Sequence, residues 1–163
     1  MLLHEVKNVK DVNEILDDFK HNDAKKYAET LIDTYGEPDG VMPGELMWRE
    51  LEGMKNIRVK DESIPHNFPA KHHDYVYSSR EIEVPEYFYS LFANVSGSIT
   101  IDGLKNTVTA RCGTLSANSV TLSFVEDVIS GNAPQEFATA KEEYGKRIKN
   151  NETPSWFKNK MEE

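Results

Sequence analysis

The residues best suited to chemistry lie in one stretch, Ile64 to Tyr77, which holds three of the chain's five histidines. Its side chains able to bind a metal or move a proton are His66, His72, His73 and Asp74. Imidazole nitrogens and carboxylate oxygens are good ligands for zinc, iron and manganese. If the protein does chemistry, this stretch is the predicted site of a divalent transition metal or of catalytic bases.

The local conformation decides which of these four side chains can share one ion. In a strand, successive side chains point to opposite faces, so His72 and Asp74 would point one way and His73 the other. His66, folded back toward them, would then complete a three-ligand site. In a loop, His73 could join as a fourth ligand.

Two prolines influence that conformation. Pro65 and Pro69 hold the chain extended and oppose both helix and ladder formation, so the sequence predicts an ordered loop here. The spacing matches no named metal motif such as His-Glu-x-x-His. One alternative is that the histidines bond backbone groups or face solvent. Another is a pH response, because neighbouring imidazoles gain charge between about pH 7 and 5.

Two further groups have a structural and a functional interpretation. Cys112, the only cysteine, follows Arg111, which would favour its thiolate. It shares the apolar phase of its segment with Val108 and Ala110, however, which predicts a buried and inert thiol. The tyrosines of the middle of the chain form either core and sheet edge or a homodimer interface: Tyr75, Tyr77, Tyr87 and Tyr89.

Charge and motifs exclude several classes of protein. The 163 residues carry a net charge of −9, most of it in the N-terminal third, which argues against nucleic-acid binding. That acidic region is a solvated helix surface or, alternatively, a mimic that inhibits a nucleic-acid-binding protein. Phosphate-binding, dinucleotide-binding and serine-hydrolase glycine motifs are absent from the sequence.

Compartment and membrane association follow from the apolar runs. The first residues lack the apolar region of a secretory signal, and no run approaches the roughly 20 residues of a membrane span. The expected location is therefore the cytoplasm, with no membrane partner.

Helical periodicity predicts an N-terminal helical hairpin. Asp11 and Glu14 begin the first helix, which is expected to end near His21, and a second helix extends to Tyr35, before Gly36. Two later helices are predicted, over 86–93 and 135–149, the last with a thin apolar side.

Alternation of apolar and polar residues predicts the strands. They are expected over 46–51, 56–61, 74–84, 97–101, 107–112 and 119–125, with Trp48 packed beneath the helices. Residues 41–61 could also contain a short helix. The fold class that follows is α+β: a mostly antiparallel sheet on which an N-terminal helical hairpin and a C-terminal helix pack. Residues 1–150 form a single domain, and 151–163 form a polar tail that is either frayed or a short anchor.

Three functions remain open, and the sequence does not decide whether the protein is an enzyme. The first is a non-catalytic interaction or accessory protein, acting as a homo-oligomer or with a protein partner. The second is a metal-binding protein or metal-dependent enzyme that uses His66, His72 and Asp74, with His73 optional. The third is the acidic mimic, for which salt-sensitive binding to a basic partner is expected.

Overall fold

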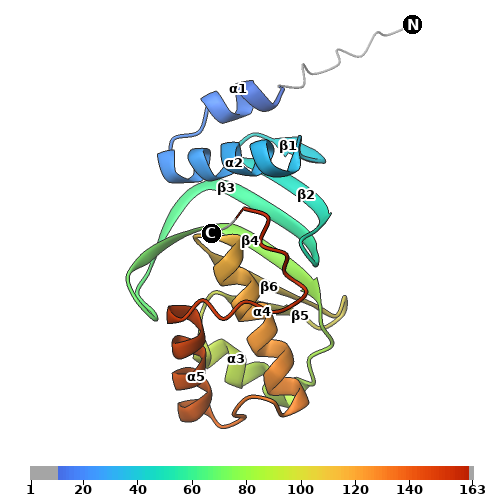
Figure 1. Cartoon of the computed structure of the whole chain (residues 1–163), viewed down its shortest axis with the longest axis vertical. Helices are drawn as coiled ribbons and strands as arrows, with labels where there is room; N and C mark the ends of the chain where they lie inside the picture. The colour runs from blue at the N-terminus through green and yellow to red at the C-terminus, as the bar shows by residue number, and fades with distance from the viewer. Residues whose placement is uncertain (1–10, 162–163) are drawn as a thin grey trace, which may run out of the picture.

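The computed structural model describes residues 11–161 of the chain. Its architecture is α+β, with a six-stranded antiparallel sheet and helices at both ends of the molecule, as the sequence predicts (Figure 1). Residues 1–10, on which the prediction that there is no secretory signal rests, lie outside the described range. The last two residues of the predicted tail, 162 and 163, lie outside it too. Within residues 11–161, the structure contains no helix with the length and apolar character needed to span a bilayer.

The sheet has the strand order β1-β2-β3-β4-β6-β5, and all neighbouring strands are antiparallel. The strands are β1 (Gly40–Met42), β2 (Glu45–Leu51), β3 (Met54–His66), β4 (His72–Glu81), β5 (Ile99–Asp102) and β6 (Thr107–Cys112). The helices are α1 (Val12–Asp17), α2 (Asn22–Tyr35), α3 (Tyr89–Val95), α4 (Leu115–Ser130) and α5 (Phe137–Lys149), with a 3-10 turn over Glu86–Phe88.

The N-terminal helices form as their sequence predicts, with small shifts in their ends. The Asp11 side chain accepts a bond of 2.9 Å from the amide of Glu14, which caps α1. This helix ends at Asp17, earlier than the predicted His21. Helix α2 exits through Gly36 at a φ of 92°, a conformation that glycine adopts without strain.

The apolar core lies against one face of the sheet. The register places Leu46, Val59 and Val76 side by side across β2, β3 and β4, and all three are fully buried. Trp48 is buried beneath the N-terminal helices, as predicted, and its indole donates to the carbonyl of Gly36 at 3.0 Å. The short-helix alternative for residues 41–61 is wrong, because this segment forms β1, β2 and most of β3.

The predicted strand over 119–125 is wrong, because these residues lie inside the long helix α4. Val120, Leu122 and Phe124 alternate in the sequence, but Thr121 between them is buried too and Ser123 is half-buried, since α4 packs on both the sheet and α5. A helix buried on most sides has no polar face to reveal its period. The two ends of α4 do carry typical helix-end residues. The Thr114 hydroxyl accepts from the amide of Ala117 and caps the helix, and Gly131 adopts a left-handed conformation.

The predicted loop around the histidines is also partly wrong. Strand β3 continues through Pro65 to His66 and pairs with β4, with His66 opposite His72 and Ile64 opposite Asp74. The pairing of β2 with β3 ends at Lys60, so this end of β3 pairs only with β4 among the described strands. A proline is tolerated there because its missing N–H can face away from the ladder.

The C-terminal segment is an anchor rather than a frayed tail. From α5 it runs back along the body toward the sheet (Figure 1, red). Phe157 is buried, and the guanidinium carbon of Arg80 lies 3.9 Å from the centre of the Trp156 ring. The backbone amides of Lys158 and Lys160 donate to the carboxylate of Glu52, at 2.8 and 2.9 Å. The segment therefore ties α5 to the turn between β2 and β3.

Candidate metal centre

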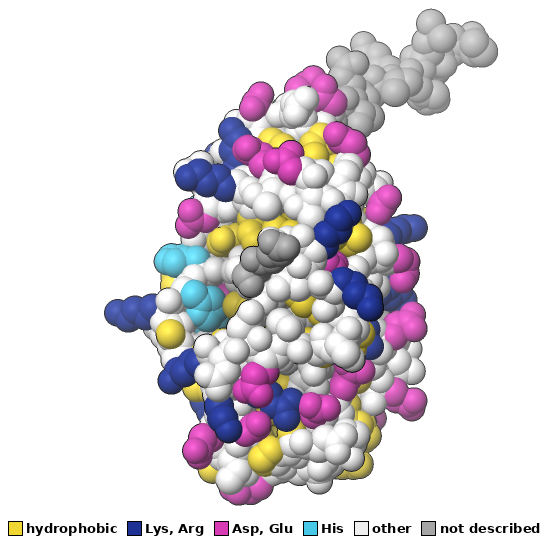
Figure 2. Space-filling model, in the orientation of Figure 1, with side chains coloured by type: hydrophobic (Ala, Val, Ile, Leu, Met, Phe, Trp, Pro, Cys, Tyr) yellow, Lys and Arg dark blue, Asp and Glu magenta, His cyan; other side chains and the backbone are white. Residues whose placement is uncertain are grey.

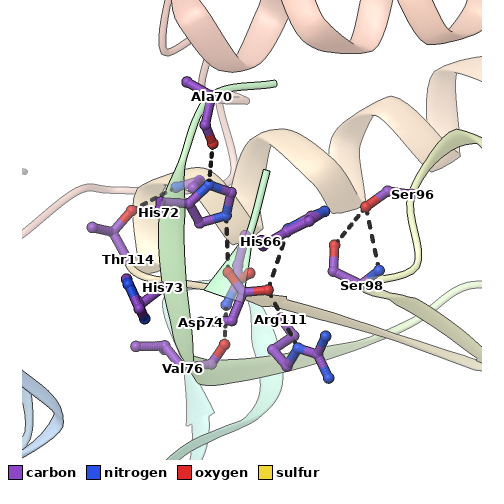
Figure 3. A network of polar contacts seen from close by, with 12 residues as sticks. His66, Ala70, His72, His73, Asp74, Val76, Ser96, Ser98, Arg111 and Thr114 are labelled. Atoms are coloured by element: carbon purple, nitrogen blue, oxygen red, sulfur yellow. Dashed lines mark hydrogen bonds and ion pairs between the residues drawn. The ribbon is translucent and has the colours of Figure 1, made fainter. Parts of the chain in front are cut away.

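The candidate site lies at the end of the β3–β4 hairpin, where His66, His72 and Asp74 converge (Figure 3). We call these three residues the histidine–aspartate cluster. Each offers one ligand atom, and the three atoms lie within 4.8 Å of one another. Ligands of a tetrahedral zinc ion lie about 3.3 Å apart, given bonds of about 2.0–2.1 Å. A small contraction would bring the three atoms to that spacing.

The strand pairing explains why these three residues meet. His72 and Asp74 are two residues apart on β4, so their side chains leave the same face, and the register sets His66 directly opposite His72. The ring centroids of the two histidines are 4.8 Å apart. His73 points away and contacts the Ser63 hydroxyl through Nδ1 at 2.8 Å. The structure thus brings together three of the four predicted ligands and leaves His73 outside.

The ligand atoms of the cluster are buried, although the two histidines are partly exposed. The Asp74 side chain is 0% exposed, against 18% for His66 and 26% for His72. His66 Nδ1 lies 3.3 Å from Asp74 Oδ2, and His72 Nε2 lies 2.9 Å from Asp74 Oδ1. The groups are close enough for ion pairing but are not aligned as hydrogen bonds. His66 Nδ1, His72 Nε2 and Asp74 Oδ1 are buried with no hydrogen-bond partner among the described residues.

The outer contacts fix the orientation of the cluster. His72 Nδ1 lies 2.8 Å from the carbonyl oxygen of Ala70, and since a carbonyl only accepts, Nδ1 carries the proton. In a neutral ring, Nε2 then presents its lone pair toward Asp74. A backbone carbonyl on the distal nitrogen is the usual arrangement for a metal-bound histidine. Arg111 Nε lies 3.3 Å from the second oxygen of Asp74.

Electrostatics keep His66 suited to be a ligand. Burial lowers the pKa of His66 below its ordinary 6.5, and the nearby positive charges of His72 and Arg111 act in the same direction, against the attraction of Asp74. A neutral imidazole is the form that binds metals.

The residues around Arg111 extend the polar network. Tyr77 donates a short hydrogen bond to Glu62, and burial, reinforced by that carboxylate, raises the pKa of Tyr77 to about 12. Hydrogen bonds with Tyr77 and Asp74 raise the pKa of Arg111 despite the opposing effect of its burial. In the sequence, Arg111 stands out only as the neighbour of Cys112. Its contact with Asp74 joins residues 37 positions apart and has no local signature.

The lone cysteine takes no direct part in the cluster. Burial raises the pKa of the Cys112 thiol to about 11, which disfavours the reactive thiolate. Figure 2 shows histidine side chains at one edge of the molecule, with Lys or Arg close by and Asp or Glu elsewhere on the same face.

Comparison with known proteins assigns no relationship. The searches found no matching family model, no matching curated protein and no matching solved structure. The geometry of the cluster is therefore the basis for a functional assignment.

Proposed function

We propose that this protein binds a divalent transition-metal ion through His66, His72 and Asp74. The observation that carries the proposal is the set of three buried ligand atoms, two nitrogens and one oxygen, that face one another with no hydrogen-bond partner within residues 11–161. Buried polar atoms without partners are costly, at about 1–3 kcal/mol each, so such a group calls for an explanation. A cation shared by the three atoms removes that cost.

The donor set narrows the choice of metal. Two imidazoles and one carboxylate suit zinc and iron(II), whereas calcium and magnesium prefer oxygen ligands alone. Three protein ligands leave a fourth position open on a tetrahedral ion, as in catalytic rather than structural zinc sites. Zinc is the first ion to test.

A proton is the competing occupant of the same space. If His72 carries protons on both nitrogens, Nε2 pairs with Asp74 at the observed 2.9 Å and no metal is needed. A proton on His66 Nδ1 would likewise pair with Asp74 Oδ2, which lies 3.3 Å away. A metal ion and protons on the two histidines are therefore alternative occupants of the same space, and titration with zinc separates them.

The deciding experiment is calorimetric titration of untagged, chelator-treated protein with zinc at pH 7.5. We expect one ion per chain, and His72→Gln should weaken binding by more than roughly a hundredfold, since loss of an outer-shell partner alone costs 10–100-fold. At 100 times its dissociation constant, zinc should also stabilise the fold by about 2.7 kcal/mol.

His73→Gln is the matched control. It removes the adjacent imidazole, which faces Ser63 rather than the cluster, and should leave zinc affinity unchanged. Zinc binding that is absent, or that falls equally in both variants, would contradict the proposal. The interaction and acidic-mimic functions, including the homo-oligomer, stay predictions from the sequence.

A further inference from the structure

The charge around the cluster constrains what could fill the open metal position. Metal-bound histidines are neutral, so Asp74 is the single anionic ligand of a divalent ion. Arg111 places a positive charge 3.3 Å from the same carboxylate. The filled centre would therefore carry an excess of positive charge at a site where Asp74 is fully buried. In such surroundings charge is weakly screened, and an anionic fourth ligand is favoured over a neutral one.

A cavity of about 290 Å³ adjoins the cluster, and His72 forms part of its wall. Its lining is mostly apolar and includes Pro69, Ala70 and Ile148. This volume lies just below the roughly 300–1,000 Å³ of ligand pockets, so it suits a molecule of few carbons.

Among the described residues, the charged side chains of that lining are those of Lys71 and Lys149. Both are exposed, and neither forms an ion pair in the described part of the chain. Unpaired ammonium groups at the edge of an apolar cavity attract anions locally. They act against the net charge of the whole chain, which is −9.

We propose that the metal-loaded protein binds a short-chain organic carboxylate, whose carboxylate occupies the open metal position and whose hydrocarbon part lies in the cavity beside His72. The proposal depends on the metal site proposed above. His72 is the residue shared by the two halves of the ligand site, since it both lines the cavity and offers Nε2 to the cluster.

The test is a titration of the cobalt(II)-loaded protein with butyrate, followed by the visible absorption of the cobalt ion. Butyrate should change the spectrum saturably, whereas butyramide, of similar shape but neutral, should not. Lys149→Gln should weaken butyrate binding about two- to fivefold, as expected for an exposed charge pair. Lys146→Gln is the matched control, because this exposed lysine of the same helix does not line the cavity.

The possible outcomes separate this proposal from the metal site itself. If cobalt binds and butyrate leaves its spectrum unchanged, the carboxylate proposal is overturned while metal binding stands. If inorganic phosphate or acetate binds as well as butyrate, the centre takes anions but the cavity contributes nothing, which also overturns it. If cobalt fails to bind in a calorimeter, both proposals fall together.

Discussion

Two buried carboxylates lie near the two ends of strand β3, and they differ in how fully they are hydrogen-bonded. Glu52, just before β3, accepts hydrogen bonds from the Tyr35 hydroxyl and from the amides of Lys158 and Lys160. Asp74, paired with the far end of β3, has one oxygen held by Arg111 and the other buried without a hydrogen-bond partner among the described residues.

The difference separates a structural carboxylate from a candidate ligand. Burial by itself raises the pKa of Glu52, but the bonds from Tyr35 and from the C-terminal amides outweigh it, so its pKa is lowered. The hydrogen bonds that Glu52 accepts join the turn before β3 to helix α2 and to the C-terminal segment. In Asp74, Oδ1 faces the imidazole of His72 and Oδ2 lies between His66 and Arg111, and a carboxylate with spare lone pairs is suited to bind a metal.

The largest expected effect is on metal binding. Asp74→Asn removes the only carboxylate of the cluster and should lower zinc affinity by more than about a hundredfold. Glu52→Gln, a change of the same chemistry at the other end of β3, should not change it. Calorimetry of both variants measures the contrast directly, and equal losses would show that the two carboxylates do not differ in this way.

The next effect is on stability. Glu52→Gln replaces a charged acceptor of several bonds and should lower the free energy of unfolding by about 2–3 kcal/mol. Urea denaturation measures it. Glu50→Gln, an exposed neighbour, should stay within about 0.5 kcal/mol of the natural protein. A small effect at Glu52 would mean that its bonds to the tail are exchanged for water without loss.

The pH dependence should follow the lowered pKa of Glu52. Its folded pKa is below the ordinary value of 4.5, so the unfolded chain binds the proton more readily and the contact stabilises the fold above pH 4.5. That stability is lost as the pH falls below 4.5 toward the folded pKa. The free energy of unfolding, measured from pH 7 to 3, should therefore decline less steeply in Glu52→Gln than in the natural protein. Parallel curves for the two proteins would contradict the assignment.

The smallest effect concerns the neighbouring contact of the tail. Trp156→Leu keeps an apolar side chain but removes the ring beneath Arg80, and should destabilise the fold by about 0.5–1 kcal/mol. Zinc affinity should be unaffected, because the contact lies near the Glu52 end of β3. Thermal unfolding with and without zinc tests both statements, and a change in the zinc-induced shift would show that the two ends are coupled.

Local pattern predicted much of the fold because its physical basis is local. Alternation predicted β2 and β6 nearly residue for residue, since each strand has one buried and one open side. The same alternation placed His72 and Asp74 on one face without His73 only if the segment was a strand, and the predicted loop left His73 as a fourth ligand. Alternation failed for α4, whose burial on most sides hides the helical period, and the prolines led to a loop where β3 continues.

The sequence by itself determined the amphipathic elements, the α+β class and the inventory of possible ligands, because these depend on residue type and spacing. Only the tertiary structure decided the state of each carboxylate. Glu52 is satisfied by amides 106 and 108 positions away, and Asp74 meets Arg111 across 37 positions. Whether a buried oxygen keeps a free lone pair depends on which distant donors the fold places beside it. Residue spacing in the sequence does not predict these long-range contacts.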